Sequence, residues 1–219
     1  NCIDAKNAEV IWAVNTHEKF RGEFHRWGYA ESLVLTEDAV ISSPTGNETA
    51  MVALDKNNGE LLWKTESLGD VRSYVSPLLI DHNGRKIILA ITSRHAAGVD
   101  AQNGTILWKF DIVTNYTDGR RNNTVTPLYH DGDIFITSGY DATALMLEMA
   151  DNGESVSLKW TNNVLDTHHG GVVLVDGYIY GSNWINNGNG NWVCLDWNTG
   201  KMMYEENWEN KGSIVYADN

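Results

Sequence analysis

The sequence has few of the residues that restrain a chain covalently or conformationally. Its 219 residues include two cysteines and three prolines. Cys2 and Cys194 are too few to form a disulfide framework, and we expect both to be small buried apolar side chains. No apolar run approaches the length of a membrane-spanning helix, about 20 residues. The sequence therefore predicts no transmembrane segment, and the cysteines do not indicate a redox compartment.

Basic residues are also scarce. There are 16 Lys and Arg residues against 29 Asp and Glu residues, so the formal net charge is −13. A general nucleic-acid-binding protein needs a basic surface. Adsorption to anionic lipid needs one as well. We therefore expect neither nucleic acid nor an anionic membrane surface as a partner.

The sequence does contain a repeated hairpin. In residues 52–63, two short apolar segments flank a turn from Asp55 to Gly59, and Trp63 ends the second segment. Asp can accept hydrogen bonds from the backbone of its own turn, and Gly adopts a positive φ without steric cost. Further copies cover residues 2–12, 97–108 and 193–204, and a degenerate copy covers residues 147–160.

The aromatic residues that end these copies have the spacing of β-propeller blades. Trp12, Trp63, Trp108, Trp160 and Tyr204 lie 51, 45, 52 and 44 residues apart. Between the hairpins, segments such as 76–81 and 126–132 each predict a strand and a turn, followed by another strand. A period of about 40–50 residues built from short strands is typical of propeller blades. The sequence predicts an all-β propeller with four-stranded antiparallel blades.

We expect one domain over residues 1–219. The chain begins within a third strand and ends after a first strand, which favours a partial ring from a longer propeller of seven or eight blades. The two open blade edges could support self-association. The expected units are a blade fragment over residues 1–13, blades over about 31–65, 76–110, 125–160 and 171–206, and the start of another blade over 213–219.

The repeated hairpin resembles the tryptophan-docking motif of PQQ-like, quinoprotein alcohol dehydrogenase-like propellers, where PQQ is pyrroloquinoline quinone. The resemblance covers essentially the whole chain and implies that each aromatic anchor packs between blades. It also implies a bacterial periplasmic or secreted protein, whose signal sequence is not in this segment. The implied docking residues are Trp12, Asp55, Gly59, Trp63, Asp100, Gly104, Trp108, Trp160, Asp196, Gly200 and Tyr204.

Any functional site is expected on one face of the propeller. The links that enter first strands are long, and they open beside the loops between second and third strands. Elaborated loops on a rigid scaffold often carry function. The Arg and His residues there would meet either a small polar or anionic ligand or the protein's own carboxylates, such as Glu23, Glu31 and Asp70. The candidates at the channel mouth are Arg26, Trp27, Arg72, Tyr74, Arg94, His95, Arg121, His168, His169 and Trp184.

Two functions are compatible with this pattern. The favoured one is a non-catalytic extracytoplasmic scaffold or binding protein with a protein partner or a small ligand. The alternative is a PQQ-dependent alcohol or sugar dehydrogenase, which would need PQQ and Ca²⁺. No adjacent cysteine pair, Ca²⁺ ligand set or catalytic Asp can be aligned here, and no other cofactor is evident. Adjacent strand residues point to opposite sides, so His168 and His169 do not predict a metal site.

Overall fold

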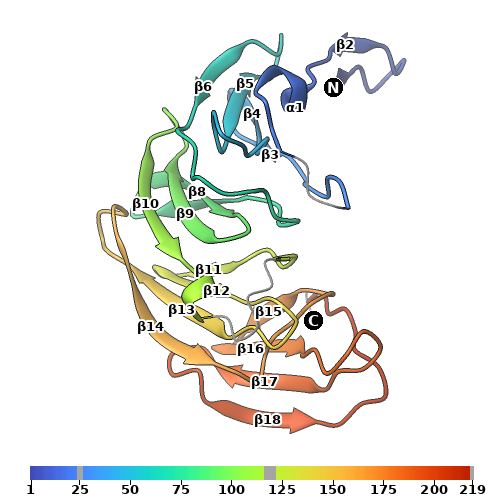
Figure 1. The fold of residues 1–219 in the computed structure, drawn as a ribbon, viewed down its shortest axis with the longest axis vertical. Coiled ribbons are helices and arrows are strands. Elements are labelled where there is room, and N and C mark those ends of the chain that lie inside the picture. Colours follow the sequence, from blue (N-terminus) through green and yellow to red (C-terminus); the bar gives the residue numbers. More distant parts are fainter. Residues whose placement is uncertain (24–26, 116–121, 218–219) are drawn as a thin grey trace.

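The chain forms an arc of antiparallel β-sheets. The computed structural model describes residues 1–23, 27–115 and 122–217. Four four-stranded sheets follow one another along the arc, and a two-stranded sheet precedes them (Figure 1). This arrangement confirms the predicted all-β propeller, seen here as a partial ring.

Each four-stranded sheet, called a blade below, is a simple meander in which strands consecutive in sequence are neighbours. The two-stranded sheet contains β1 (Cys2–Ile3) and β2 (Val10–Trp12). Blade 1 contains β3 (Val34–Leu35), β4 (Ala39–Ser42), β5 (Val52–Asp55) and β6 (Leu61–Lys64). Blade 2 contains β7 (Leu78–His82), β8 (Arg85–Ile91), β9 (His95–Asp100) and β10 (Ile106–Asp111). Blade 3 contains β11 (Leu128–His130), β12 (Asp133–Ile136), β13 (Ala144–Met149) and β14 (Val156–Asn162). Blade 4 contains β15 (Val172–Val175), β16 (Tyr178–Ser182), β17 (Trp192–Asp196) and β18 (Met202–Glu206).

The described helices are short. They are α1 (Thr16–Lys19) and a 3₁₀ turn, η1 (Val113–Asn115). Within the described ranges, neither is long and apolar enough to cross a membrane.

The core lies between the blades. The second and third strands carry continuous apolar runs because neighbouring blades cover both of their faces. For example, Ile87 and Leu89 of blade 2 belong to the same buried cluster as Ile134, Leu145 and Leu147 of blade 3. The fourth strands are more exposed, and every residue of β18 is exposed. The protein is therefore held together by contacts between blades as well as within them.

Tryptophans of one blade pack onto glycine turns of the next. A Cβ atom added to Gly59 would lie 2.7 Å from Trp12, and one added to Gly104 would lie 2.5 Å from Trp63. Both glycines have a φ of +75°. The Trp12 indole also donates a 3.0 Å hydrogen bond to the carbonyl of Lys56. These contacts have the inter-blade geometry that the motif implies.

Trp108 is an exception. It is 7% exposed, but its indole lies over Gly98 of its own blade, where an added Cβ would be 2.3 Å from Nε1. The turn of blade 3 that would receive it contains Gly153, whose added Cβ would instead meet Ile87. Polar contacts join blades 2 and 3 there: His82 Nε2 lies 2.9 Å from the Ala150 carbonyl, and Arg85 Nη1 donates to the Asn152 carbonyl. A polar contact set therefore takes the place of tryptophan docking at this interface.

The final segment also differs from expectation. Tyr204 is 49% exposed, and residues 213–217 do not form the predicted first strand. Ile214 makes a 3.2 Å backbone hydrogen bond to Gly170, outside any ladder. A first strand becomes regular by pairing with a second strand, and the described chain provides none beside it.

Candidate functional site

In each of three blades, the segment that precedes the first strand is hydrogen-bonded to the loop that joins the second and third strands. Glu23 N donates to Thr45 O at 2.8 Å, and Ser93 N donates to Val71 O at 3.0 Å. Asp166 accepts a hydrogen bond from Trp184 N at 3.0 Å. The two kinds of loop therefore form one surface at the same end of the blades, called the long-loop face below.

A concavity on this face, called the rim pocket below, draws residues from the loops of all four blades. Its volume is about 230 Å³. Four of its residues are among the candidates from the sequence, so topology does bring part of that set together. The lining residues are Trp27, Tyr74, Asn122, Thr124, Tyr140, His168 and His169.

Aromatic rings dominate the rim pocket. The rings of Trp27 and Tyr74 lie 6.2 Å apart, centre to centre, and are tilted by 54°. Tyr140 lies 4.3 Å from His168. It also lies 5.1 Å from Trp184, which does not line the pocket itself. Trp27 lines the pocket and is 63% exposed.

Both histidines have a lowered pKa, which favours the neutral imidazole at neutral pH. Burial, together with the nearby His169 and Lys211, lowers the pKa of His168 from 6.5 to about 4. Burial is also the main cause that lowers the pKa of His169, followed by Lys211. A buried cation without a carboxylate partner is unfavourable, which explains the direction for His168. His169 is exposed, and partial desolvation and the charge of Lys211 lower its pKa. The described lining of the rim pocket therefore carries no formal charge.

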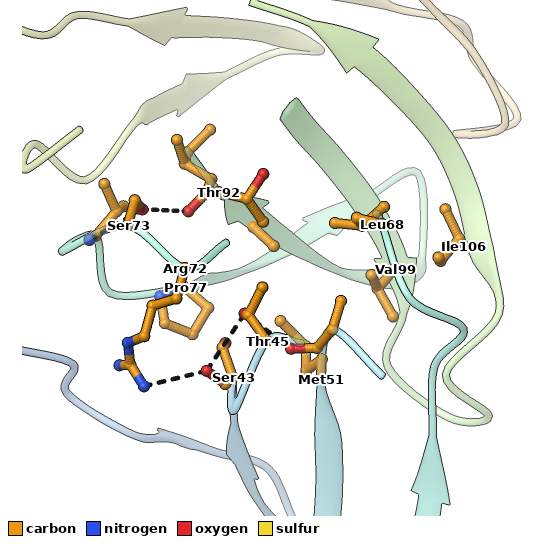
Figure 2. A pocket seen from close by; sticks show the side chains of 14 residues that line it. Ser43, Thr45, Met51, Leu68, Arg72, Ser73, Pro77, Thr92, Val99 and Ile106 are labelled. Atoms are coloured by element: carbon orange, nitrogen blue, oxygen red, sulfur yellow. Dashed lines mark hydrogen bonds between the residues drawn. The ribbon is translucent and has the colours of Figure 1, made fainter. Parts of the chain in front are cut away.

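Arg72 does not reach this pocket. Its Nη2 lies 2.7 Å from Glu31 Oε2, and both side chains are 5% exposed. Burial raises the pKa of Glu31, whereas Arg72 acts against that shift. The guanidinium also donates to the Ser43 carbonyl at 3.1 Å, as Figure 2 shows beside a small cavity between blades 1 and 2. That cavity has a volume of about 20 Å³, enough for about one water molecule.

Arg94 and His95 are also paired with carboxylates. Arg94 donates to Asp111 Oδ2 from Nε at 2.9 Å and from Nη2 at 2.6 Å. His95 Nδ1 lies 2.8 Å from Asp70 Oδ2. Of the remaining candidates, Arg26 and Arg121 lie outside the described residues. The described arginines thus meet the protein's own acids, which was one of the two alternatives left open by the sequence.

Asp166 is a residue that sequence reasoning missed. It is 5% exposed and accepts backbone hydrogen bonds from Asp141 at 2.9 Å and Trp184 at 3.0 Å. Burial raises its pKa from 3.8 to about 6, although these hydrogen bonds oppose the shift. Asp166 therefore joins the loop that carries Tyr140 to the loop that carries Trp184. No motif marks it, because both of its partners are backbone groups distant in sequence.

The described residues do not fit a quinone cofactor with its calcium ion. PQQ carries several carboxylates, which need cationic or donor-rich partners. The rim pocket offers uncharged side chains, and Arg72 and Arg94 are already paired. In residues 1–23, 27–115 and 122–217, no three His, Cys, Asp or Glu side chains are grouped so that they could hold a metal ion.

Comparison with known protein families shows which family the chain belongs to. A family model described as outer membrane protein assembly factor BamB matches residues 1–210. The chain belongs to this family. The predicted resemblance to PQQ-like propellers is thereby confirmed. No curated protein matches the sequence significantly.

Solved structures with the same fold include BamB-type and quinoprotein propellers. BamB from Moraxella catarrhalis matches with a TM-score of 0.59 and 18% identity, over 82% of this chain and 51% of that one. Quinohemoprotein alcohol dehydrogenase from Comamonas testosteroni matches with a TM-score of 0.58 and 14% identity, over 83% of this chain and 36% of that one. The chain thus spans about half the length of the first structure and about a third of the second. At these identities the likeness shows the fold.

Proposed function

We propose that this protein is a non-catalytic extracytoplasmic scaffold that binds a partner through its long-loop face. The observation that carries the proposal is the match of the BamB family model over residues 1–210, since that family is described as an assembly factor for outer membrane proteins. By this reasoning the partner is a protein of outer-membrane assembly, and the location is periplasmic.

The described chemistry of the long-loop face supports binding rather than catalysis. Arg72, Arg94 and His95 are held in ion pairs or hydrogen bonds with Glu31, Asp111 and Asp70. Asp166 is bonded to backbone groups and does not line the rim pocket. Exposed side chains nearby, including Trp27 at 63% and Ile185 at 51%, offer apolar contact area for a partner.

Site-specific photo-crosslinking in the native organism tests this proposal. A photoreactive amino acid at Ile185 on the long-loop face should crosslink to a component of outer membrane protein assembly, identified by mass spectrometry. The matched control is Asn58, which is exposed in a turn at the opposite end of blade 1. Equal crosslinking at both positions, or no assembly component at Ile185, would contradict the proposal.

A separate assay tests the alternative function, that of a PQQ-dependent dehydrogenase. Alcohol oxidation with an artificial electron acceptor is measured after adding PQQ and Ca²⁺ to the purified protein. The proposed scaffold shows no stimulated turnover. Saturable PQQ-dependent activity would favour the alternative, whose cofactor would have to be held by groups other than those described in the rim pocket.

Self-association through exposed blade edges is the remaining partner hypothesis. The fourth strand of blade 4 presents Met202, Met203 and Tyr204, each between 42% and 49% exposed. Unpaired strand edges readily pair with other strands. Light scattering over a concentration series distinguishes a monomer from such an assembly.

A further inference from the structure

The rim pocket combines flat aromatic faces with uncharged groups that both donate and accept hydrogen bonds. We propose that it binds one ring of a neutral saccharide, with the Trp27 face as its platform. This inference rests on the proposed function, because it names a ligand for the same face. Neither the family match nor the structural similarities assign such a ligand.

The aromatic side of the pocket suits the C–H face of a sugar ring. Trp27 is 63% exposed, and its ring lies 6.2 Å from that of Tyr74 at an angle of 54°. On the other side, Tyr140 is backed by Trp184 at 5.1 Å and by His168 at 4.3 Å. Packing apolar C–H groups against such rings removes apolar area from water.

The polar groups suit hydroxyls better than ions. An Asn amide, a Thr hydroxyl and a neutral imidazole each offer both donor and acceptor atoms. Asn122 and His168 place an amide and an imidazole in the lining. Thr124 offers only acceptor lone pairs there, because its hydroxyl donates to the His168 carbonyl. Sugar hydroxyls also donate and accept, whereas an anion needs donors only and a cation needs acceptors only.

His168 argues against a purely apolar ligand. The residue is 6% exposed, and its Nδ1 is buried without a hydrogen-bond partner in the described structure. A buried unpaired polar atom is costly, and an atom without accessible surface can be reached only if the His168 ring turns toward the pocket. A ligand hydroxyl could then supply the missing partner, whereas a proline or phenyl ring could not.

The charge and the size of the rim pocket also favour a small neutral ligand. Lys211 is close enough to lower the pKa of both histidines, but it does not line the pocket. The volume of about 230 Å³ is below the range of about 300–1,000 Å³ typical of small-molecule sites. The rim pocket therefore has room for one ring rather than for a large cofactor.

A second groove could hold further rings. It has a volume of about 560 Å³ and shares Thr124, His168 and His169 with the rim pocket. It continues along β11 and reaches Leu78 of β7 and Val172 of β15. A disaccharide should therefore bind more tightly than its monosaccharide.

Isothermal titration calorimetry with defined probes tests the proposal. The neutral probes are glucose, N-acetylglucosamine, maltose and cellobiose, and the charged probes are glucuronate, inorganic phosphate and tetramethylammonium. At least one neutral saccharide should bind, with an affinity that added salt does not change because neither side is charged. Trp27→Ala should weaken binding about tenfold, and Trp27→Phe should restore part of it.

The matched control is Trp208→Ala, because Trp208 is similarly exposed, at 58%, and lies outside the rim pocket. It should leave saccharide binding unchanged. The inference is overturned if no neutral saccharide binds, if Trp27→Ala and Trp208→Ala behave alike, or if a charged probe binds in preference. Failure of saccharide binding together with assembly-factor crosslinking at Ile185 would reject this inference and leave the proposed function standing.

Discussion

The indole of Trp63 lies directly over Gly104, so that a Cβ atom on this glycine would be 2.5 Å from Trp63 Cε3. Trp63 belongs to blade 1 and Gly104 to the turn of blade 2. The contact therefore makes a local turn residue part of the interface between two blades. A side chain added at position 104 should therefore disturb the packing between these two blades.

Gly104→Ala should destabilise the protein by about 3 kcal/mol. A left-handed backbone costs an L-residue about 1–2 kcal/mol, and overpacking against the indole adds about 1–3 kcal/mol. Gly84→Ala is the matched control, because Gly84 has a φ of +84° but nothing within 4 Å of the added Cβ. Urea unfolding should show the larger loss for Gly104→Ala, and equal losses would show that the inter-blade contact contributes little.

Trp108 and Trp160 should respond differently to replacement by Phe. Trp160 Nε1 donates a 3.1 Å hydrogen bond to the Trp197 carbonyl, whereas the buried Nε1 of Trp108 has no partner in the described structure. Trp160→Phe loses a hydrogen bond worth about 1 kcal/mol, whereas Trp108→Phe removes an unsatisfied donor. Both variants lose packing volume.

We therefore expect Trp108→Phe to be the less destabilising of the two, although Trp108 is the more buried residue. Chemical denaturation of both variants measures the difference. A larger loss for Trp108→Phe would indicate that packing volume, rather than the indole N–H, determines the outcome.

Much of the fold could be predicted because its signal is local and repeated. The turn from Asp55 to Gly59 needs only its own residues: Asn57 N donates to Asp55 Oδ1 at 2.7 Å, and Gly59 N donates to the Asp55 carbonyl at 2.9 Å. The different packing of Trp108 could not be predicted in this way. It accompanies contacts between His82 and Ala150, which are 68 residues apart.

The candidate site was only partly predictable for the same reason. Topology brings Trp27, Tyr74, His168 and His169 together, because the links before first strands meet at one end of the blades. The partners of the arginines depend on tertiary geometry instead. Arg72 and Glu31 are 41 residues apart, and a net charge of −13 does not indicate which acid each arginine will meet.

Breaking the ion pair between Arg72 and Glu31 should be costly. Glu31→Gln keeps the side-chain shape but leaves a guanidinium that is 5% exposed without its carboxylate. Removing one partner of a buried pair costs about 3–5 kcal/mol. The double variant Glu31→Gln/Arg72→Met should be more stable than Glu31→Gln alone, because no buried charge is left unpaired.

The control for this prediction is Glu48→Gln in the surface pair with Arg21, whose side chains are 40% and 80% exposed. A surface pair contributes about 0–1 kcal/mol, so thermal unfolding should barely change. A double variant as unstable as Glu31→Gln alone would show that packing, and not the unpaired charge, causes the loss.

The last prediction concerns two groups whose titrations oppose each other. Asp166 has a pKa raised from 3.8 to about 6, so the folded state binds more protons than the unfolded state between these values. Its contribution to stability is present at low pH and is lost as the pH rises to about 6. His168 has a pKa lowered from 6.5 to about 4. In that interval the unfolded state binds more protons, so its contribution increases as the pH rises.

Each contribution is on the order of 1–3 kcal/mol, so the two largely offset each other in the wild-type protein. Asp166→Asn removes the Asp166 contribution, so the variant should gain stability relative to the wild type as the pH rises from about 3.8 to 6. His168→Gln removes the His168 contribution, so this variant should lose stability relative to the wild type as the pH rises from about 4 to 6.5. Asp151→Asn, at an exposed turn, controls for the loss of one negative charge. Unfolding free energies are measured across this interval and subtracted from those of the wild type, so that contributions from other titrating groups cancel. Difference curves of opposite slope are expected, and parallel curves would refute the assignment of these two pKa shifts to burial beneath the long-loop face.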